Sequence, residues 1–179
     1  MKNKFEVLKN EDEHSIRNKI VQIRNTLESI EDPDFTFKYT PVNDFEDKQN
    51  YPLDFQIYME EIGETELALG GYIITWVETP QNPYKLKHDS NLWGVNTEDF
   101  EDDEIWDEPT NLKVKDTRVI TYDIDASISY FDTRTNPFKF LNTFEDDQFP
   151  FFLSWLAYKV DPHLEMANTS VRLENILND

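Results

Sequence analysis

The sequence predicts an α+β fold in which an antiparallel sheet meander has helices packed at its N- and C-terminal ends. Three observations predict this fold: an apolar stripe of helical period near the N-terminus, alternation with a period of two through the middle, and a broad apolar helical face near the C-terminus. Sequential strands with short connections favour antiparallel over parallel pairing. Helices followed by a sheet and then by helices indicate the α+β class.

The first predicted helix lies between Glu11 and Ile30. Its apolar stripe has spacings of four, three, four and three residues and consists of Ile16, Ile20, Ile23, Leu27 and Ile30. Arg17, Lys19 and Arg24 are expected outside the stripe. Acidic residues at the start suit the positive end of the helix dipole, and an Asp-Pro-Asp segment ends the helix. The stripe is interpreted as a core face in preference to a partner-binding face.

A second helix is predicted from Tyr51, and Gly63 is its natural end. Alternating segments then predict the strands, and Gly70 and Gly71 predict a bulge or tight turn between two of them. The predicted strands are Phe35–Tyr39, Leu67–Leu69, Tyr72–Val77, Thr117–Asp125, Ser127–Phe131 and Phe138–Leu141.

The C-terminal part predicts two more helices. The longer one begins near Phe149 with a cap from Asp146 or Asp147, and Asp161 followed by Pro162 is expected to stop it. Either Thr169 or Ser170 is expected to cap a last short helix that ends near residue 177.

The composition excludes several classes of function. The chain of 179 residues has 37 Asp and Glu against 17 Lys and Arg, which gives a formal net charge of -20. Such a charge disfavours nucleic acids and anionic membranes as direct partners. The absence of Cys excludes disulfides, thiolate metal sites and cysteine nucleophiles. No signal-peptide pattern is present, so we expect a cytoplasmic protein.

Catalytic signatures are also missing from the sequence. Four Gly residues cannot build a glycine-rich phosphate loop, and the three His residues lie far apart. We therefore expect no enzyme activity, no cofactor and no metal site. Chance carboxylate pairs leave a hydrolase open as a less favoured alternative.

The window Asn96–Pro109 is the sharpest local feature, because it carries eight carboxylates and no basic residue. It lacks the Gly turn and the alternating pattern of an EF-hand loop. Apolar side chains among charges suit a surface that attracts a basic partner and anchors it with rings, although the same side chains could pin a loop to the core. The predicted partner-binding residues are Asp99, Phe100, Glu101, Asp102, Asp103, Trp106 and Asp107, with Tyr72 and Trp76 as further anchors.

Four segments resemble, in the same order, the motifs of the SUKH superfamily. Tyr51–Gly63 resembles its "LP-x-D-[YF]-x-x-[FY]-[LM]…G" helix, and Gly70–Glu78 resembles the strand that follows, with its acidic end. Tyr122–Phe138 is similar to the late hairpin, where a "[YF]-D" strand leads to a Pro, and Phe149–Leu156 is similar to the closing helix. The resemblance implies a twisted antiparallel sheet with helices around it.

This resemblance also implies a function and a division of the chain. We expect one domain over residues 1–179, with an N-terminal helix region at 1–34, a SUKH-like core at 44–160 and a C-terminal short helix at 161–179. The superfamily includes bacterial immunity proteins and fungal cell-wall-synthesis regulators of the Smi/Knr type. The leading hypothesis is a non-enzymatic immunity protein, or antitoxin, of bacterial competition systems. It would bind a basic, nuclease-like toxin domain. The alternatives are a Smi/Knr-type regulatory interaction module and an acidic domain whose charge serves only solubility.

Overall fold

The structure is a computed structural model, and it describes residues 8–82, 105–107, 111–122, 128–142, 149–167 and 169–179. The N-terminal half contains α1 (Glu13–Glu28), β1 (Phe35–Thr40), a 3-10 turn η1 (Lys48–Asn50), α2 (Leu53–Glu61), β2 (Glu64–Leu69) and β3 (Tyr72–Val77). The C-terminal half contains β4 (Ile105–Asp107), β5 (Leu112–Lys113), a 3-10 turn η5 (Val114–Asp116), β6 (Thr117–Tyr122), β7 (Ile128–Asp132), β8 (Lys139–Asn142), α3 (Phe152–Met166) and α4 (Leu173–Asn178).

The predicted α+β class with antiparallel meanders is confirmed. The described strands form two three-stranded antiparallel sheets, β1–β2–β3 and β6–β7–β8, and a small pair, β4–β5. The division of the meander into two sheets was not predicted. The sheets are joined where Glu78 N–H donates to the carbonyl of Ile120 at 2.7 Å and where Gln81 forms a bridge with Val119.

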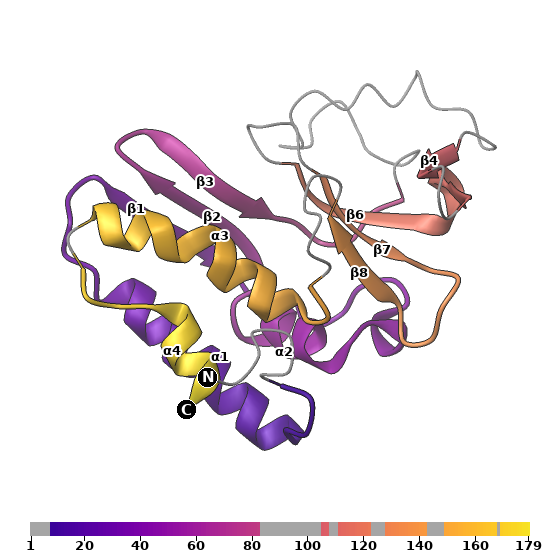
Figure 1. Cartoon of the computed structure of the whole chain (residues 1–179), viewed down its shortest axis with the longest axis horizontal. Helices are drawn as coiled ribbons and strands as arrows, with labels where there is room; N and C mark the ends of the chain where they lie inside the picture. Colours follow the sequence, from indigo (N-terminus) through magenta and orange to yellow (C-terminus); the bar gives the residue numbers. More distant parts are fainter. Residues whose placement is uncertain (1–7, 83–104, 108–110, 123–127, 143–148, 168) are drawn as a thin grey trace.

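Helix α3 covers the β1–β2–β3 sheet, and the helices share one apolar core with both sheets (Figure 1). Helix α3 lies across this sheet and contacts β3, while α4 packs against α3 and α1. The centre of the core is aromatic: the ring of Phe55 on α2 lies 4.8 Å from that of Phe131 on β7 and 5.0 Å from that of Phe152 on α3. These contacts hold the second sheet against the helices.

Helix α1 agrees with its predicted stripe, except at Lys19. Asp12 caps the helix by accepting a hydrogen bond from the N–H of Ser15 at 2.8 Å, and the stripe residues before Ile30 are buried. Lys19 was expected outside the stripe but is only 7% exposed. Its burial is tolerated because its ammonium group pairs with the carboxylate of Glu11 at 3.3 Å and donates to the carbonyls of Leu177 at 3.1 Å and Ile176 at 3.3 Å.

The two glycine predictions are confirmed. Gly70 and Gly71 form the turn between β2 and β3, and both have positive φ angles. Gly63 follows α2 with a φ of 80°, and a Cβ atom at this position would collide with the carbonyl oxygen of Thr40. Only glycine therefore allows the chain to leave α2 and enter β2 so close to β1.

The predicted end of α3 was wrong. The helix continues through Pro162 to Met166, although proline removes one backbone donor from a helix. Val160 and Leu164 are fully buried on its core side, and this burial favours a continued helix. The proposed caps Asp146 and Asp147 lie outside the described residues.

The predicted cap of the last helix was also wrong. Helix α4 begins at Leu173, beyond Thr169 and Ser170. Its first N–H groups, those of Leu173 and Glu174, donate to the two carboxylate oxygens of Asp161 at 2.6 and 3.0 Å. The residue expected to stop one helix therefore caps the next.

Candidate functional site

Most of the predicted partner-binding window cannot be placed. Asp99, Phe100, Glu101, Asp102 and Asp103 lie outside the described residues. Trp106 and Asp107 lie in β4, whose backbone pairs antiparallel with β5, and their side chains are outside the description. The role of this window stays a prediction.

The two further anchors lie on β3 at different positions. Tyr72 directly follows the Gly70–Gly71 turn and is 77% exposed. Trp76 lies four residues further along and is partly buried. The structure does not bring them into one hollow, because the groove that Trp76 lines does not include Tyr72.

Trp76 lines a groove of about 400 Å³, which we call the sheet groove. It is formed by the β1–β2–β3 sheet and the segment that follows β3, and its lining residues are Lys38, Tyr39, Thr40, Glu64, Thr65, Glu66, Trp76, Val77, Glu78 and Gln81. Strand pairing positions them: Lys38 is opposite Glu66, Glu66 is opposite Trp76, and Thr40 is opposite Glu64.

Strand alternation explains why Lys38, Glu66 and Trp76 share one face of the sheet. Thr65, Leu67 and Val77 are buried toward the core, so their neighbours Glu64, Glu66 and Trp76 project from the opposite face. The partly buried indole of Trp76 thus lies directly opposite the carboxylate of Glu66. The carboxylate of Glu64 lies two residues earlier in β2.

The sheet groove is negatively charged, because three glutamates line it against one lysine. The ammonium group of Lys38 lies 3.1 Å from a carboxylate oxygen of Glu66. Glu64 accepts a hydrogen bond from the hydroxyl of Thr79 at 2.8 Å, which holds its side chain at the rim. The arrangement suits a cationic group that packs its apolar part on Trp76.

The glutamates of this groove were missed in the sequence analysis. The signal that could have found them is the alternation Glu64, Glu66 against Thr65, Leu67, which places two carboxylates on one face. The opposition of Glu66 to Trp76 needs the register across the Gly70–Gly71 turn, which includes a shift between Leu67 and Ala68.

A second hollow, of about 630 Å³, is mostly lined by apolar residues around the starts of α2 and α3. Asp54 lies in its wall and is 2% exposed. Its Oδ2 accepts a hydrogen bond from the N–H of Leu153 at 3.1 Å, which caps α3 from another helix. Burial raises the pKa of Asp54 to about 6, although backbone N–H groups favour the charged form.

Neither a metal-binding cluster nor a membrane-spanning helix is found in the described part of the chain. No cluster of three or more His, Asp or Glu side chains there could hold a metal ion. Among the same residues, no helix has both the length and the apolar character needed to cross a membrane.

Comparison with known proteins identifies no relative. No family model matches the chain, and neither a curated protein nor a solved structure matches it.

Proposed function

We propose that the chain is a non-enzymatic binding protein, an immunity protein that neutralises a basic, nuclease-like toxin domain through an acidic surface. The observation that carries the proposal is the sheet groove, where Trp76 lies opposite Glu66 on a face that holds three glutamates and one lysine. Buried rings beside charges are typical of residues that dominate protein–protein binding energy.

The net charge of -20 supports a basic partner in the same way. Nuclease surfaces that hold phosphates are positive, so an acidic protein is steered toward them and can block them. The resemblance to the SUKH superfamily, carried by the helix before Gly63 and the strand that holds Trp76, supports the immunity role.

The test uses the immobilised full chain to capture proteins from the native host. We expect a basic partner whose recovery falls steeply between low and high salt, because surface charges are screened. Co-expression of the chain with the captured protein should restore growth that the captured protein alone arrests. Binding that hardly responds to salt, together with no effect on growth, would instead indicate a regulatory interaction module and contradict the proposal.

Variants of the groove locate the contact. Trp76→Ala should weaken binding by about 30-fold or more, as for a central aromatic anchor. Glu66→Lys should slow association and reduce its salt dependence, whereas Glu31→Lys makes the same charge change at an exposed position outside the groove and serves as the control. Unchanged affinity of both groove variants would contradict the sheet groove as the site.

A further inference from the structure

Strand β1 forms one edge of its sheet, because the strand order is β1–β2–β3. The N–H of Gly70 donates to the carbonyl of Asp34 at 2.9 Å, in the same register that pairs β1 with β2. Hydrogen-bonding direction alternates along an antiparallel strand, so every second residue from Asp34 onward directs its backbone groups toward β2. The N–H and carbonyl groups of Phe37 and Tyr39 therefore point away from the sheet, together with the carbonyl of Phe35.

These outward backbone groups have no hydrogen-bond partner among the residues that the structure describes. Edge strands in natural proteins are commonly protected from pairing with another chain by a proline, a bulge, a short length or a charged side chain. Strand β1 has six residues, no proline and no register shift against β2. Its only charged side chain is Lys38, whose ammonium group lies 3.1 Å from a carboxylate oxygen of Glu66. The outer edge of β1 can therefore accept a further strand.

The side chains beside this edge suit a strand that carries both apolar and basic residues. The rings of Phe37 and Tyr39 stack with their centres 5.0 Å apart and are partly exposed, so apolar side chains can pack beside them. The carboxylate of Glu28 accepts from the hydroxyl of Tyr39 at 2.6 Å, and the exposed Asp34 directly precedes β1. Among the described residues, no cation forms an ion pair with either carboxylate. Each end of the edge thus has a carboxylate that a basic residue can pair with.

We propose that β1 binds an extended segment of another protein, which pairs antiparallel to it as a fourth strand and carries basic residues beside Glu28 and Asp34. The segment exchanges hydrogen bonds with Phe37 and Tyr39 and packs apolar side chains beside Phe35 and Phe37. A second copy of the chain is a poorer partner, because it brings a net charge of -20 and its own carboxylates to the same edge. The proposal stands apart from the immunity role, since any protein with such a segment would satisfy it.

The probe is the peptide Ac-Lys-Thr-Val-Thr-Val-Lys-NH2, whose first lysine is designed to lie opposite Tyr39 and whose last lysine is designed to lie opposite Asp34. Titration of the full chain, followed by NMR, should show saturable binding. Near saturation, hydrogen exchange of the Phe37 and Tyr39 amides should slow by about fivefold or more, because each gains a hydrogen bond. The amides of Thr36 and Lys38 already face β2 and should change less. A peptide with glutamate in place of both lysines should bind about fivefold more weakly or worse.

Two N-methylated peptides separate strand addition from other modes of binding. The N–H of the first valine faces Phe37, so its methylation should weaken binding by about tenfold or more. The N–H of the threonine that follows points away from β1, and its methylation should change the affinity by less than about threefold. Equal effects of the two methyl groups would overturn the proposal. A dimer of the chain that the peptide dissociates, measured by sedimentation, would assign the edge to a second copy and would also contradict it.

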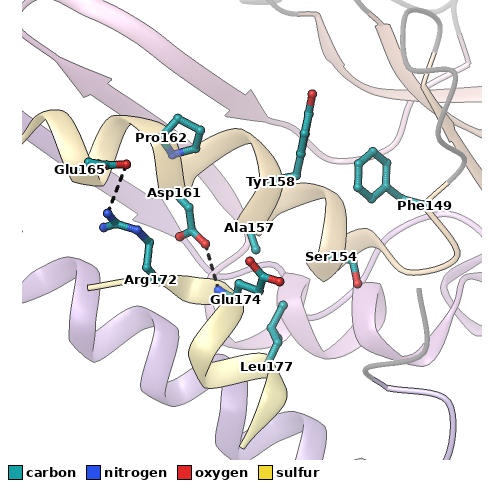
Figure 2. A pocket seen from close by; sticks show the side chains of 10 residues that line it. All are labelled: Phe149, Ser154, Ala157, Tyr158, Asp161, Pro162, Glu165, Arg172, Glu174 and Leu177. Atoms are coloured by element: carbon teal, nitrogen blue, oxygen red, sulfur yellow. Dashed lines mark hydrogen bonds and ion pairs between the residues drawn. The ribbon is translucent and has the colours of Figure 1, made fainter. Parts of the chain in front are cut away.

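Variants of the chain test the charges. Glu28→Gln and Asp34→Asn should each weaken peptide binding by about two- to threefold. Glu174→Gln removes one charge from α4, where Figure 2 shows the side chain directed toward α3, and should leave the affinity unchanged. Trp76→Ala, two strands away on β3, should also leave it unchanged, so failure of this proposal and failure of the immunity role are separate results. Equal weakening by all four variants would show that the peptide does not bind at the edge of β1.

Discussion

At the scale of single residues, Asp54 shows how one buried carboxylate serves two helices. It lies in the first turn of α2 and accepts from the N–H of Leu153 at the start of α3. Helix α3 has no side-chain cap of its own at Phe151, so this contact stands in for one. Asp54 lies 99 positions before Leu153, so no sequence pattern beside α3 indicates this cap, and the predicted caps Asp146 and Asp147 lie outside the described residues.

The raised pKa of Asp54 makes stability depend on pH. The folded chain holds this proton up to a pKa of about 6, while the unfolded chain releases it near 3.8. The protonated carboxyl group of Asp54 therefore contributes its full stabilisation below about pH 4. This contribution, about 3 kcal/mol at most, is lost as the pH rises through 6. Asp54→Asn keeps an oxygen for Leu153 and removes the titration.

We expect the free energy of unfolding of Asp54→Asn minus that of wild type to increase between pH 4 and 6.5. At pH 7.5 the variant should be more stable than wild type by about 1–3 kcal/mol. Urea unfolding at several pH values measures it, with the exposed Asp44→Asn as the control. A difference that stays constant with pH would show that Asp54 does not titrate in this range.

At the scale of elements, α4 is held by charges from two other helices. A helix of six residues is not stable alone in water. Asp161 of α3 accepts from the first N–H groups of α4, and Lys19 of α1 donates to its last carbonyls. Each charge therefore interacts favourably with the helix dipole. Burial of Leu173 and Leu177 completes the attachment.

Both end contacts are expected to control local opening of α4. Lys19→Met keeps the apolar stem and Asp161→Asn keeps one acceptor oxygen, so each should destabilise α4 by about 1–2 kcal/mol. Hydrogen exchange of the α4 amides should accelerate about 5- to 30-fold while that of α2 changes less. Lys38→Met, which removes an exposed ammonium from the sheet, is the control. Equal acceleration in α2 and α4 would contradict a local role.

Local signals account for what the sequence predicted correctly. The stripe of α1, the turn at Gly70 and Gly71 and the end of α2 at Gly63 each depend on residues within a few positions of one another. The errors at Lys19 and Asp161 have a different origin, since these side chains bind residues 158 and 12 positions away. No periodicity in the sequence reports such a contact.

The same limit applies to the candidate site, where local features could be predicted and contacts between strands could not. The sequence could place Trp76 on a strand, because an aromatic residue in an alternating segment is a local feature, and its role as an anchor stays a prediction. It could not place Glu66 opposite Trp76, since the register of β2 and β3 includes an irregularity after Leu67. The acidic window that carried most of the predicted contacts lies mainly outside the described residues.

At the scale of the whole molecule, two electrostatic effects act on stability in opposite directions. Ion pairs between the helices stabilise the fold, and repulsion among the excess negative charges destabilises it. Arg17 on α1 lies 2.7 Å from both Glu60 and Glu61 of α2, and Lys48 lies 2.8 Å from Glu60. The hydrogen bond from Lys48 lowers the pKa of Glu60. These attractions are partly exposed and worth about 1 kcal/mol or less each, whereas a net charge of -20 repels itself over the whole surface.

Salt should therefore stabilise the protein. Raising NaCl from about 0.02 to 0.5 M shortens the screening length from roughly 20 Å to about 4 Å, which weakens long-range repulsion more than ion pairs in contact. We expect the Tm at pH 7.5 to rise by about 3–8 °C, measured by circular dichroism.

Arg17→Met separates the two effects: its Tm should lie below that of wild type at low salt and should rise further with salt, because an ion pair that salt weakens has been removed. A Tm that falls with salt in wild type but not in Arg17→Met would show that the contacts between α1 and α2 outweigh the repulsion.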